Sequence, residues 1–231
     1  MKAFYFKNHA GNPLLQKIIS AFFDDNFNQL SLVQVQFLLR TLDDYIFVLT
    51  GQPTIKIIID TESKKNYRGH YSHNYDGYSF KNETMEIIAK DRTLSGVDYL
   101  IIYLHEKFHQ FQFHSVIENN KDISETTLQI WKWCAEYTDG LKGTSTYEEY
   151  LANPIERDAY RYQYDQILDL TELYLDKKKQ KKAKKELKRL QIATWVDNDI
   201  NHDNEGLTYI IIQNAKREFS PEDIFYRKKR V

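Results

Sequence analysis

Residues 95–111 constrain the fold more than any other segment, because they predict a long helix with a broad apolar surface. Ser95, followed by Asp98 three residues later, resembles a capping box, which marks the start of a helix. The uninterrupted apolar run from Tyr99 to Leu104 indicates that this helix is largely buried. Apolar residues recur at helical spacing along it, at Val97, Leu100, Leu104, Phe108 and Phe111. Any polar residue of the same helix therefore needs a partner.

Two histidines and a glutamate lie on this helix, in the sequence His105-Glu106-Lys107-Phe108-His109. Residues four apart lie one turn above each other, so the imidazoles of His105 and His109 point to one place. Zinc binds such nitrogens at about 2.0–2.1 Å, and a catalytic zinc site has a third protein ligand and a position open to water. Glu106 can accept a proton from that water, whose pKa the metal lowers. We therefore expect His105 and His109 to bind zinc (Zn2+) and Glu106 to act as general base.

This pattern of three fixed positions in five residues is informative but short. It would arise by accident in roughly one chain in a hundred of this length. An accidental match would as often fall in a loop, whereas this one lies on a capped, amphipathic helix. The alternative is that the three residues are ordinary surface residues, or core residues with hydrogen-bond partners.

The motif and its helix resemble those of the zincin metallopeptidases. Over roughly residues 54–175, that resemblance implies a zincin-like α+β fold, with a small mixed or antiparallel sheet on the active-site helix, and a peptide-hydrolysing activity. The metzincin branch has a glycine and a third histidine at positions held here by Gln112 and Ser115. His114 is one residue out of register, so we exclude that branch.

The gluzincin branch takes its third metal ligand from a glutamate on a later helix, and Glu156 is the candidate here. Asn153-Pro154 predicts a helix start, with Asn153 as the N-cap, and so fixes the direction of a carboxylate in the first turn. Residues 153–159 also resemble the Asn-Pro-x-Glu-x-(Asp/Glu)-Ala stretch of small gluzincin-like families, whose motif helix often continues with a glutamine, as at Gln110 and Gln112. Glu156 could instead only complete the cap. Weaker rivals for the third ligand are Glu136, Glu148, Glu149 and His202.

One departure from the gluzincin pattern leaves the partners of the histidines unpredicted. Thermolysin-like gluzincins have an aspartate four residues after the ligand glutamate, where it supports a metal-binding histidine, but position 160 is Tyr here. Asp158 points to a different side of the helix. Tyr160 lies on the face of Glu156 and could donate a hydrogen bond to the oxyanion of a tetrahedral intermediate. Packing is the commoner role of a tyrosine in a chain with 17 of them.

The remaining sequence predicts helices around a small sheet. Asn12-Pro13 and Ser31 are start signals for two helices, so residues 1–52 predict an N-terminal helical layer ahead of a zincin-like catalytic core at 53–176. Two runs of strand character, Thr54 to Asp60 and Thr84 to Ala89, predict a small antiparallel or mixed sheet, and the first should lie inside it. The tyrosine-rich segment His70 to Tyr78 could shape a substrate cleft or form an exposed aromatic hairpin.

Composition bounds the partners and the cellular setting. The formal charge of −1 gives no overall attraction to nucleic acid or membranes. The single cysteine, Cys134, excludes an intrachain disulfide and a multi-cysteine zinc site, and we expect it to be a small buried residue. The sequence has no recognisable signal peptide and no apolar run of about 18 residues, so we expect a cytoplasmic protein without a membrane span. Export without a signal peptide would leave no trace.

Residues 177–231 predict a basic helical segment and a C-terminal extension packed on the core. Lys177–Arg189 contains seven lysines between 177 and 185, which usually means a solvated surface, with local phosphate binding as the alternative. The second basic cluster, Arg227–Arg230, indicates a frayed tail.

The sequence thus predicts a zinc-dependent hydrolase, most simply a peptidase, with a peptide or protein substrate. A peptidase that acts as an exported toxin or effector would share this chemistry. The alternative is a non-catalytic module of the same fold that binds a protein or, through Lys177–Arg189, a nucleic acid. Neither the substrate nor the oligomeric state can be predicted.

Overall fold

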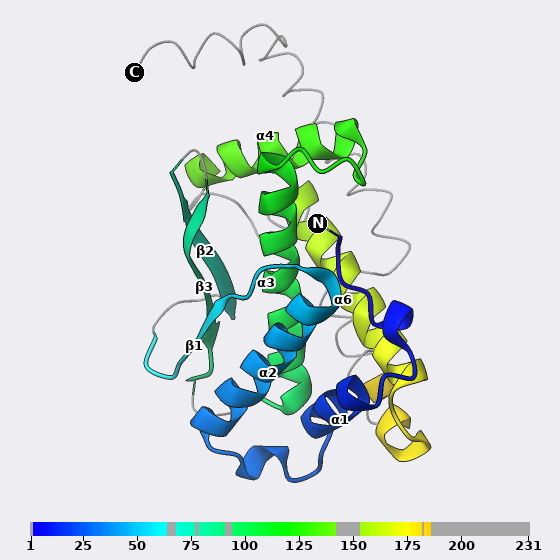
Figure 1. Cartoon of the computed structure of the whole chain (residues 1–231). Coiled ribbons are helices and arrows are strands. Elements are labelled where there is room, and N and C mark those ends of the chain that lie inside the picture. Colours follow the sequence, from blue (N-terminus) through cyan, green and yellow to red (C-terminus); the bar gives the residue numbers. More distant parts are fainter. Residues whose placement is uncertain are drawn as a thin grey trace, which may run out of the picture.

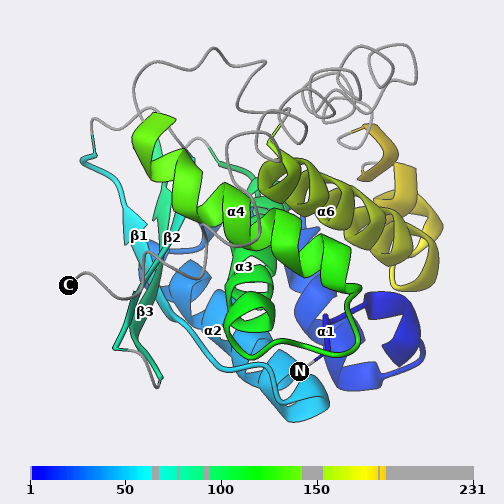
Figure 2. The ribbon, with the colours of Figure 1, turned by 90° about the horizontal axis from the view of Figure 1, so that it is seen from above.

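Helix α3 (Gly96–Ile117) runs through the centre of the molecule, between a small sheet and helix α6 (Pro154–Leu173) (Figures 1 and 2). Helix α4 (Glu125–Leu141), which the sequence did not predict, crosses α3 near one end (Figure 2). The prediction of an α+β protein is confirmed. The computed structural model describes residues 2–63, 68–76, 79–90, 94–141, 153–181 and 183–185.

The N-terminal helices begin where their capping residues predict. The side chain of Asn12 accepts a hydrogen bond from the backbone of Leu15 and so caps α1 (Pro13–Phe22). Ser31 forms a capping box with Gln34 at the start of α2 (Leu32–Thr50). Gly51 ends α2 with φ of 71°, a left-handed conformation that suits glycine. Two short 3₁₀ turns, η1 (Phe6–His9) and η2 (Phe27–Gln29), lie before these helices.

Residues 54–90 predict a small antiparallel or mixed sheet, and the sheet is mixed. It contains β1 (Lys56–Asp60), β2 (Gly69–Tyr75) and β3 (Phe80–Ile88) in the order β1-β3-β2. Strand β3 is parallel to β1 and antiparallel to β2. The tyrosine-rich segment therefore includes a strand at one edge of the described sheet.

The β-branched run was expected inside the sheet, and this prediction was wrong: β1 is an edge strand of the described sheet. Ile57 is fully buried, whereas the next residue, Ile58, is 36% exposed, so only one face of β1 packs against the core. Helix α2 packs beside this strand, and the side chain of Gln36 donates a hydrogen bond to the carbonyl of Ile57 at 2.6 Å. An isoleucine run does not reveal strand order, because pairing partners are distant in sequence.

Helix α3 is buried on nearly all sides, as its apolar run predicts. Nineteen of its 22 residues are buried, and it packs against β2, β3, α1, α4 and α6. The predicted capping box between Ser95 and Asp98 starts the helix. Several of its buried residues are polar, and their partners determine how the helix is oriented.

Lys107, inside the histidine motif, forms a buried ion pair that joins α3 to α2. Its Nζ lies 2.7 Å from Asp43 Oδ1 and donates to the carbonyl of Pro53 at 2.6 Å. Asp43 also accepts hydrogen bonds from Tyr103 and from the backbone of Ile55. Burial lowers the pKa of Lys107, although Asp43 opposes that shift. These contacts therefore hold α3 on the face opposite the histidines and prevent its rotation about its own axis.

A substitution of Lys107 by methionine should destabilise the protein by about 3–5 kcal/mol, because it leaves the Asp43 carboxylate buried without a counter-charge. Urea unfolding followed by circular dichroism measures this loss. The matched control is Lys132→Met on α4, which removes an exposed lysine and should change the free energy of unfolding by less than about 0.5 kcal/mol. Equal stability of the two variants would contradict the assigned role of the pair.

Candidate metal centre

Helix α6 places Glu156 against the two histidines of α3. The side chain of Asn153 accepts a hydrogen bond from the backbone of Ile155 at 3.1 Å, and Pro154 occupies the first turn, so the helix begins where predicted. Glu156 then lies in the first turn and is directed toward α3. Its Oε2 lies 3.2 Å from His105 Nε2 and 3.5 Å from His109 Nε2.

The three atoms form a compact triangle of the size that a metal requires. The two Nε2 atoms of His105 and His109 are 3.0 Å apart, which completes a triangle with Glu156 of 3.0, 3.2 and 3.5 Å. Atoms at about 2.0–2.2 Å from a tetrahedral zinc lie about 3.3–3.6 Å from one another. The donor set and its spacing therefore fit a zinc ion with only small adjustments of the side chains.

The electrostatics of the cluster favour a positive charge at its centre. Burial lowers the pKa of His109, but the Glu156 carboxylate outweighs burial and raises that pKa to about 9. Burial raises the pKa of Glu156, but His109 and His105 outweigh it and hold that pKa well below its usual range. A carboxylate and two imidazole nitrogens thus attract a cation, which is a proton on His109 or a metal ion.

Gln112 connects the two helices that carry these residues. Its Oε1 lies 2.8 Å from His109 Nδ1, and its Nε2 donates to the carbonyl of Ile155 at 3.1 Å. Since the amide oxygen only accepts, Nδ1 of His109 carries a proton, which leaves Nε2 as the nitrogen that faces Glu156 and can bind a metal ion in place of its own proton. The sequence indicated Gln112 only as a glutamine that continues the motif helix and as a mismatch to the metzincins, so this connection was not predicted.

Replacing Gln112 by leucine should weaken zinc binding about 10-fold to 100-fold while leaving the three candidate ligands in place, because outer-sphere partners orient metal-binding histidines. Competition with a chromogenic chelator measures the affinity. Gln129→Leu on α4 removes an exposed glutamine and serves as the control, with unchanged affinity expected. Indistinguishable affinities for wild type and Gln112→Leu would show that this hydrogen bond does not orient His109.

Glu106 faces the sheet and lies directly under strand β2. A Cβ atom added to Gly69 would lie 2.5 Å from Glu106 Oε1 and 2.6 Å from Ile102 Cγ2, so only glycine fits at this point. Glu106 is buried. The buried carboxylate therefore packs against an edge strand of the described sheet, one residue along α3 from His105.

Tyr160 and Asp158 occupy the two sides of α6 that the sequence predicts. The ring of Tyr160 packs against the ring of His105, with 4.5 Å between their centres. Asp158 instead accepts a hydrogen bond from the indole of Trp131 on α4, at 2.9 Å. Tyr160 is thus the residue of the two that lies beside the cluster.

Strand β2 is attached to α3 through Glu83 of β3. Its Oε1 accepts hydrogen bonds from Tyr71 at 2.6 Å, His114 Nε2 at 2.9 Å and Gln110 at 3.0 Å. His114, the histidine out of register with the metzincin pattern, therefore faces the sheet and not the cluster. Tyr71 is buried, so part of the tyrosine-rich segment packs against the motif helix, while Tyr75 is 42% exposed.

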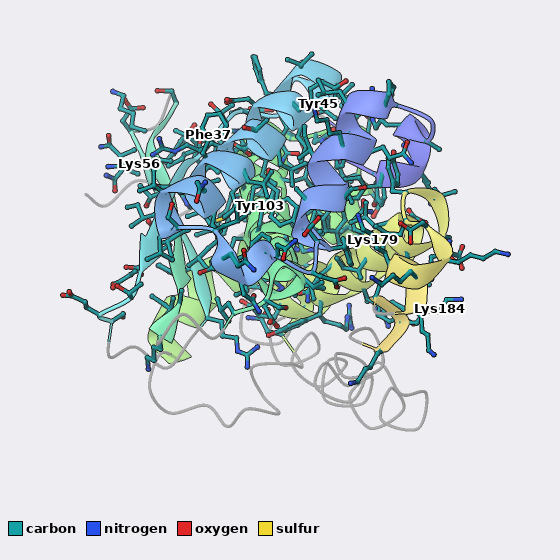
Figure 3. All side chains as sticks on the ribbon, turned by 90° about the horizontal axis from the view of Figure 1, so that it is seen from below. Phe37, Tyr45, Lys56, Tyr103, Lys179 and Lys184 are labelled. Carbon is teal, nitrogen blue, oxygen red and sulfur yellow. The ribbon has the colours of Figure 1, made fainter. Side chains whose placement is uncertain are left out.

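The basic segment Lys177–Arg189 is described only in part. Lys178 Nζ lies 3.0 Å from Asp25, and Lys179 donates to the carbonyl of Ser20, so two lysines contact the end of α1 and the loop after it. Lys179 and Lys184 are on the yellow segment in Figure 3. Several predicted features lie outside the described residues, namely Glu148, Glu149, His202 and Arg227–Arg230; of Glu136, only the backbone is described, within α4.

Cys134 is buried, and burial raises the pKa of its thiol to about 12. A thiol with such a pKa carries little thiolate at neutral pH, and the thiolate is the nucleophilic form. Its structural environment is therefore that of a packing residue, as the sequence indicates.

His105, His109 and Glu156 form the one group of three or more histidine, cysteine or acidic residues, within the described part of the chain, whose ligand atoms lie close enough to hold a metal. These atoms all lie within 4.8 Å of one another.

No protein-family model, curated protein or solved structure matches the chain. None of the helices in the described ranges has the length and apolarity needed to cross a membrane.

Proposed function

We propose that this protein is a zinc-dependent hydrolase that cleaves peptide bonds, with a gluzincin-like zincin fold. The observation that carries the proposal is the triangle of His105 Nε2, His109 Nε2 and Glu156 Oε2, with sides of 3.0, 3.2 and 3.5 Å. Three protein ligands are the number found in catalytic zinc sites, which keep a further position for water or substrate. Structural zinc sites are instead closed by four protein ligands.

The donor atoms support zinc over magnesium and calcium. Imidazole nitrogen suits zinc, copper, iron and nickel, whereas magnesium and calcium take oxygen ligands almost exclusively. One carboxylate with two histidines is a ligand set of established catalytic zinc sites. A bound zinc would supply Lewis acidity, which polarises a carbonyl and lowers the pKa of water.

Glu106 is the proposed proton carrier in this reaction. It is the residue after His105, and its carboxylate lies against Gly69 of β2. Its carboxylate would accept a proton from the attacking water and pass it to the leaving amine. Because Gly69 lets the backbone of β2 approach within contact of this carboxylate, the strand limits both its motion and its access to solvent.

Strand β2 supports a peptide as the substrate class. It has a single strand neighbour, β3, in the described sheet, and it lies directly above the general-base candidate. An extended peptide can pair with such an edge through its backbone, which aligns a scissile carbonyl without requiring a particular side chain.

Two variants of the motif should show that zinc binding and hydrolysis depend on different residues. His105→Ala should lose stoichiometric zinc, measured by mass spectrometry of the purified protein, because one of three ligands is gone. Glu106→Gln should retain zinc and lose about 10²-fold to 10⁴-fold in hydrolysis of a peptide library, since the general base is removed. Glu125→Gln on α4 is the exposed carboxylate control and should match wild type in both. Wild-type protein that takes up no zinc when zinc is supplied would refute the proposal.

Tyr160 is proposed to donate a hydrogen bond to the oxyanion that forms during attack. Tyr160→Phe keeps the ring that packs on His105 and removes only the hydroxyl. We expect kcat to fall about 10²-fold to 10³-fold, with unchanged zinc content and KM within a few-fold. Tyr45→Phe, which removes a hydroxyl bonded to Asn12, is the control. An unchanged kcat in Tyr160→Phe would assign this residue to packing.

A further inference from the structure

Helix α2 has two apolar surfaces on opposite sides, only one of which is used by the core. The inner surface is buried and consists of Val35, Leu39, Leu42 and Ile46. The outer surface consists of Val33, Phe37, Phe47 and Val48, which are 75%, 72%, 49% and 71% exposed. Phe37 lies on the α2 ribbon in Figure 3. A helix on the surface of a globular protein usually has one apolar stripe, so the outer surface calls for a partner.

The exposed residues of α2 follow the spacing of a helix-pairing seam. Residues 33, 37, 40, 44 and 47 of α2 and Gly51, which ends the helix, are all exposed, and they alternate in steps of four and three. This is the heptad spacing of two helices that pack side by side. Apolar residues occupy the two halves of the seam, and two opposite charges, Arg40 and Asp44, occupy its middle.

We propose that α2 pairs in antiparallel orientation with α2 of a second copy of this chain. In the register that places Phe37 against Phe47 of the second copy, Arg40 faces Asp44 of the second copy. Twofold symmetry repeats both contacts, so each phenylalanine of the seam meets a phenylalanine and each charge meets its opposite, while Val48 lies beside the seam. Val33 then lies against Gly51, which has no side chain to prevent close approach. A parallel pair would instead oppose Arg40 to Arg40 and Asp44 to Asp44.

The size of the patch sets the strength of this association. A fully buried aromatic side chain covers about 150–250 Å², so four partly exposed apolar side chains supply several hundred Å² per copy. That area is at the lower end of specific interfaces, which bury about 800 Å² per partner. We therefore expect a dissociation constant on the order of 10 µM, with the Arg40 and Asp44 pairs fixing orientation more than adding affinity. The dimer is independent of the proposed catalytic function, because none of the candidate metal-centre residues lies on α2.

Sedimentation velocity of the full chain from about 2 to about 200 µM tests the pairing, since this range spans the expected dissociation constant. Wild type should convert from monomer to dimer across the range. Arg40→Asp and Asp44→Arg should each weaken the dimer about 10-fold or more, because each creates two like-charge contacts. The double variant R40D/D44R should return to within about 3-fold of wild type, since the opposite charges face each other again.

Phe37→Ala should also weaken the dimer about 10-fold, and Lys132→Asp, a charge reversal on α4, should leave it unchanged. Thermal unfolding should be close to wild type in all these variants, because every substituted residue is exposed. A wild-type protein that stays monomeric throughout the range would overturn the proposal. A dimer that R40D leaves intact, or that the double variant fails to restore, would overturn it equally.

Discussion

The burial of polar side chains along α3 is the constraint on which the rest of the structure depends. A helix that is buried on nearly all sides cannot leave a lysine, a glutamine or a histidine without a partner, since each would lose its hydration. Lys107 finds its partner on α2, His114 on β3, and Gln112 on α6. Three neighbouring elements are thereby fixed relative to one helix. Any rotation of α3 would break all three sets of contacts at once.

The same constraint organises the candidate site. Gln112 joins His109 to the backbone next to Glu156, so the relative position of α3 and α6 is set by a hydrogen bond that needs no metal. The contact of Glu106 with the backbone of Gly69 sets the distance between the motif and β2. A metal at this site would thus join elements that the protein already holds together. Such a metal would therefore serve chemistry, because contacts among the described residues already hold these elements together.

Features encoded by neighbouring residues were predictable from the sequence, and those that depend on packing were not. Helix starts at Ser31, Ser95 and Asn153 follow from side chains that cap their own helix, whereas the nearness of Glu156 to the histidines was predicted from the resemblance to the gluzincins. The edge position of β1 and the bridge through Gln112 depend on how distant elements meet, which local patterns do not contain. Helical periodicity located the apolar residues of α2, but it could not separate those that face the core from those that face outward.

Helices α2 and α3 both contain side chains whose polarity does not match their surroundings. The two helices differ in where those side chains find partners. On α3, polar residues in an apolar setting are satisfied within the chain, and the result is a fixed geometry around His105, Glu106 and His109. On α2, four apolar side chains stay exposed to water in the described part of the chain. In the proposed dimer, a second copy covers them. Arg40 and Asp44 lie in the middle of that seam. There, an antiparallel pair brings opposite charges together, whereas a parallel pair brings like charges together. Charges at these positions also stabilise α2 itself, because opposite charges four residues apart on a helix attract each other, and across the proposed seam they fix the relative orientation of the two helices.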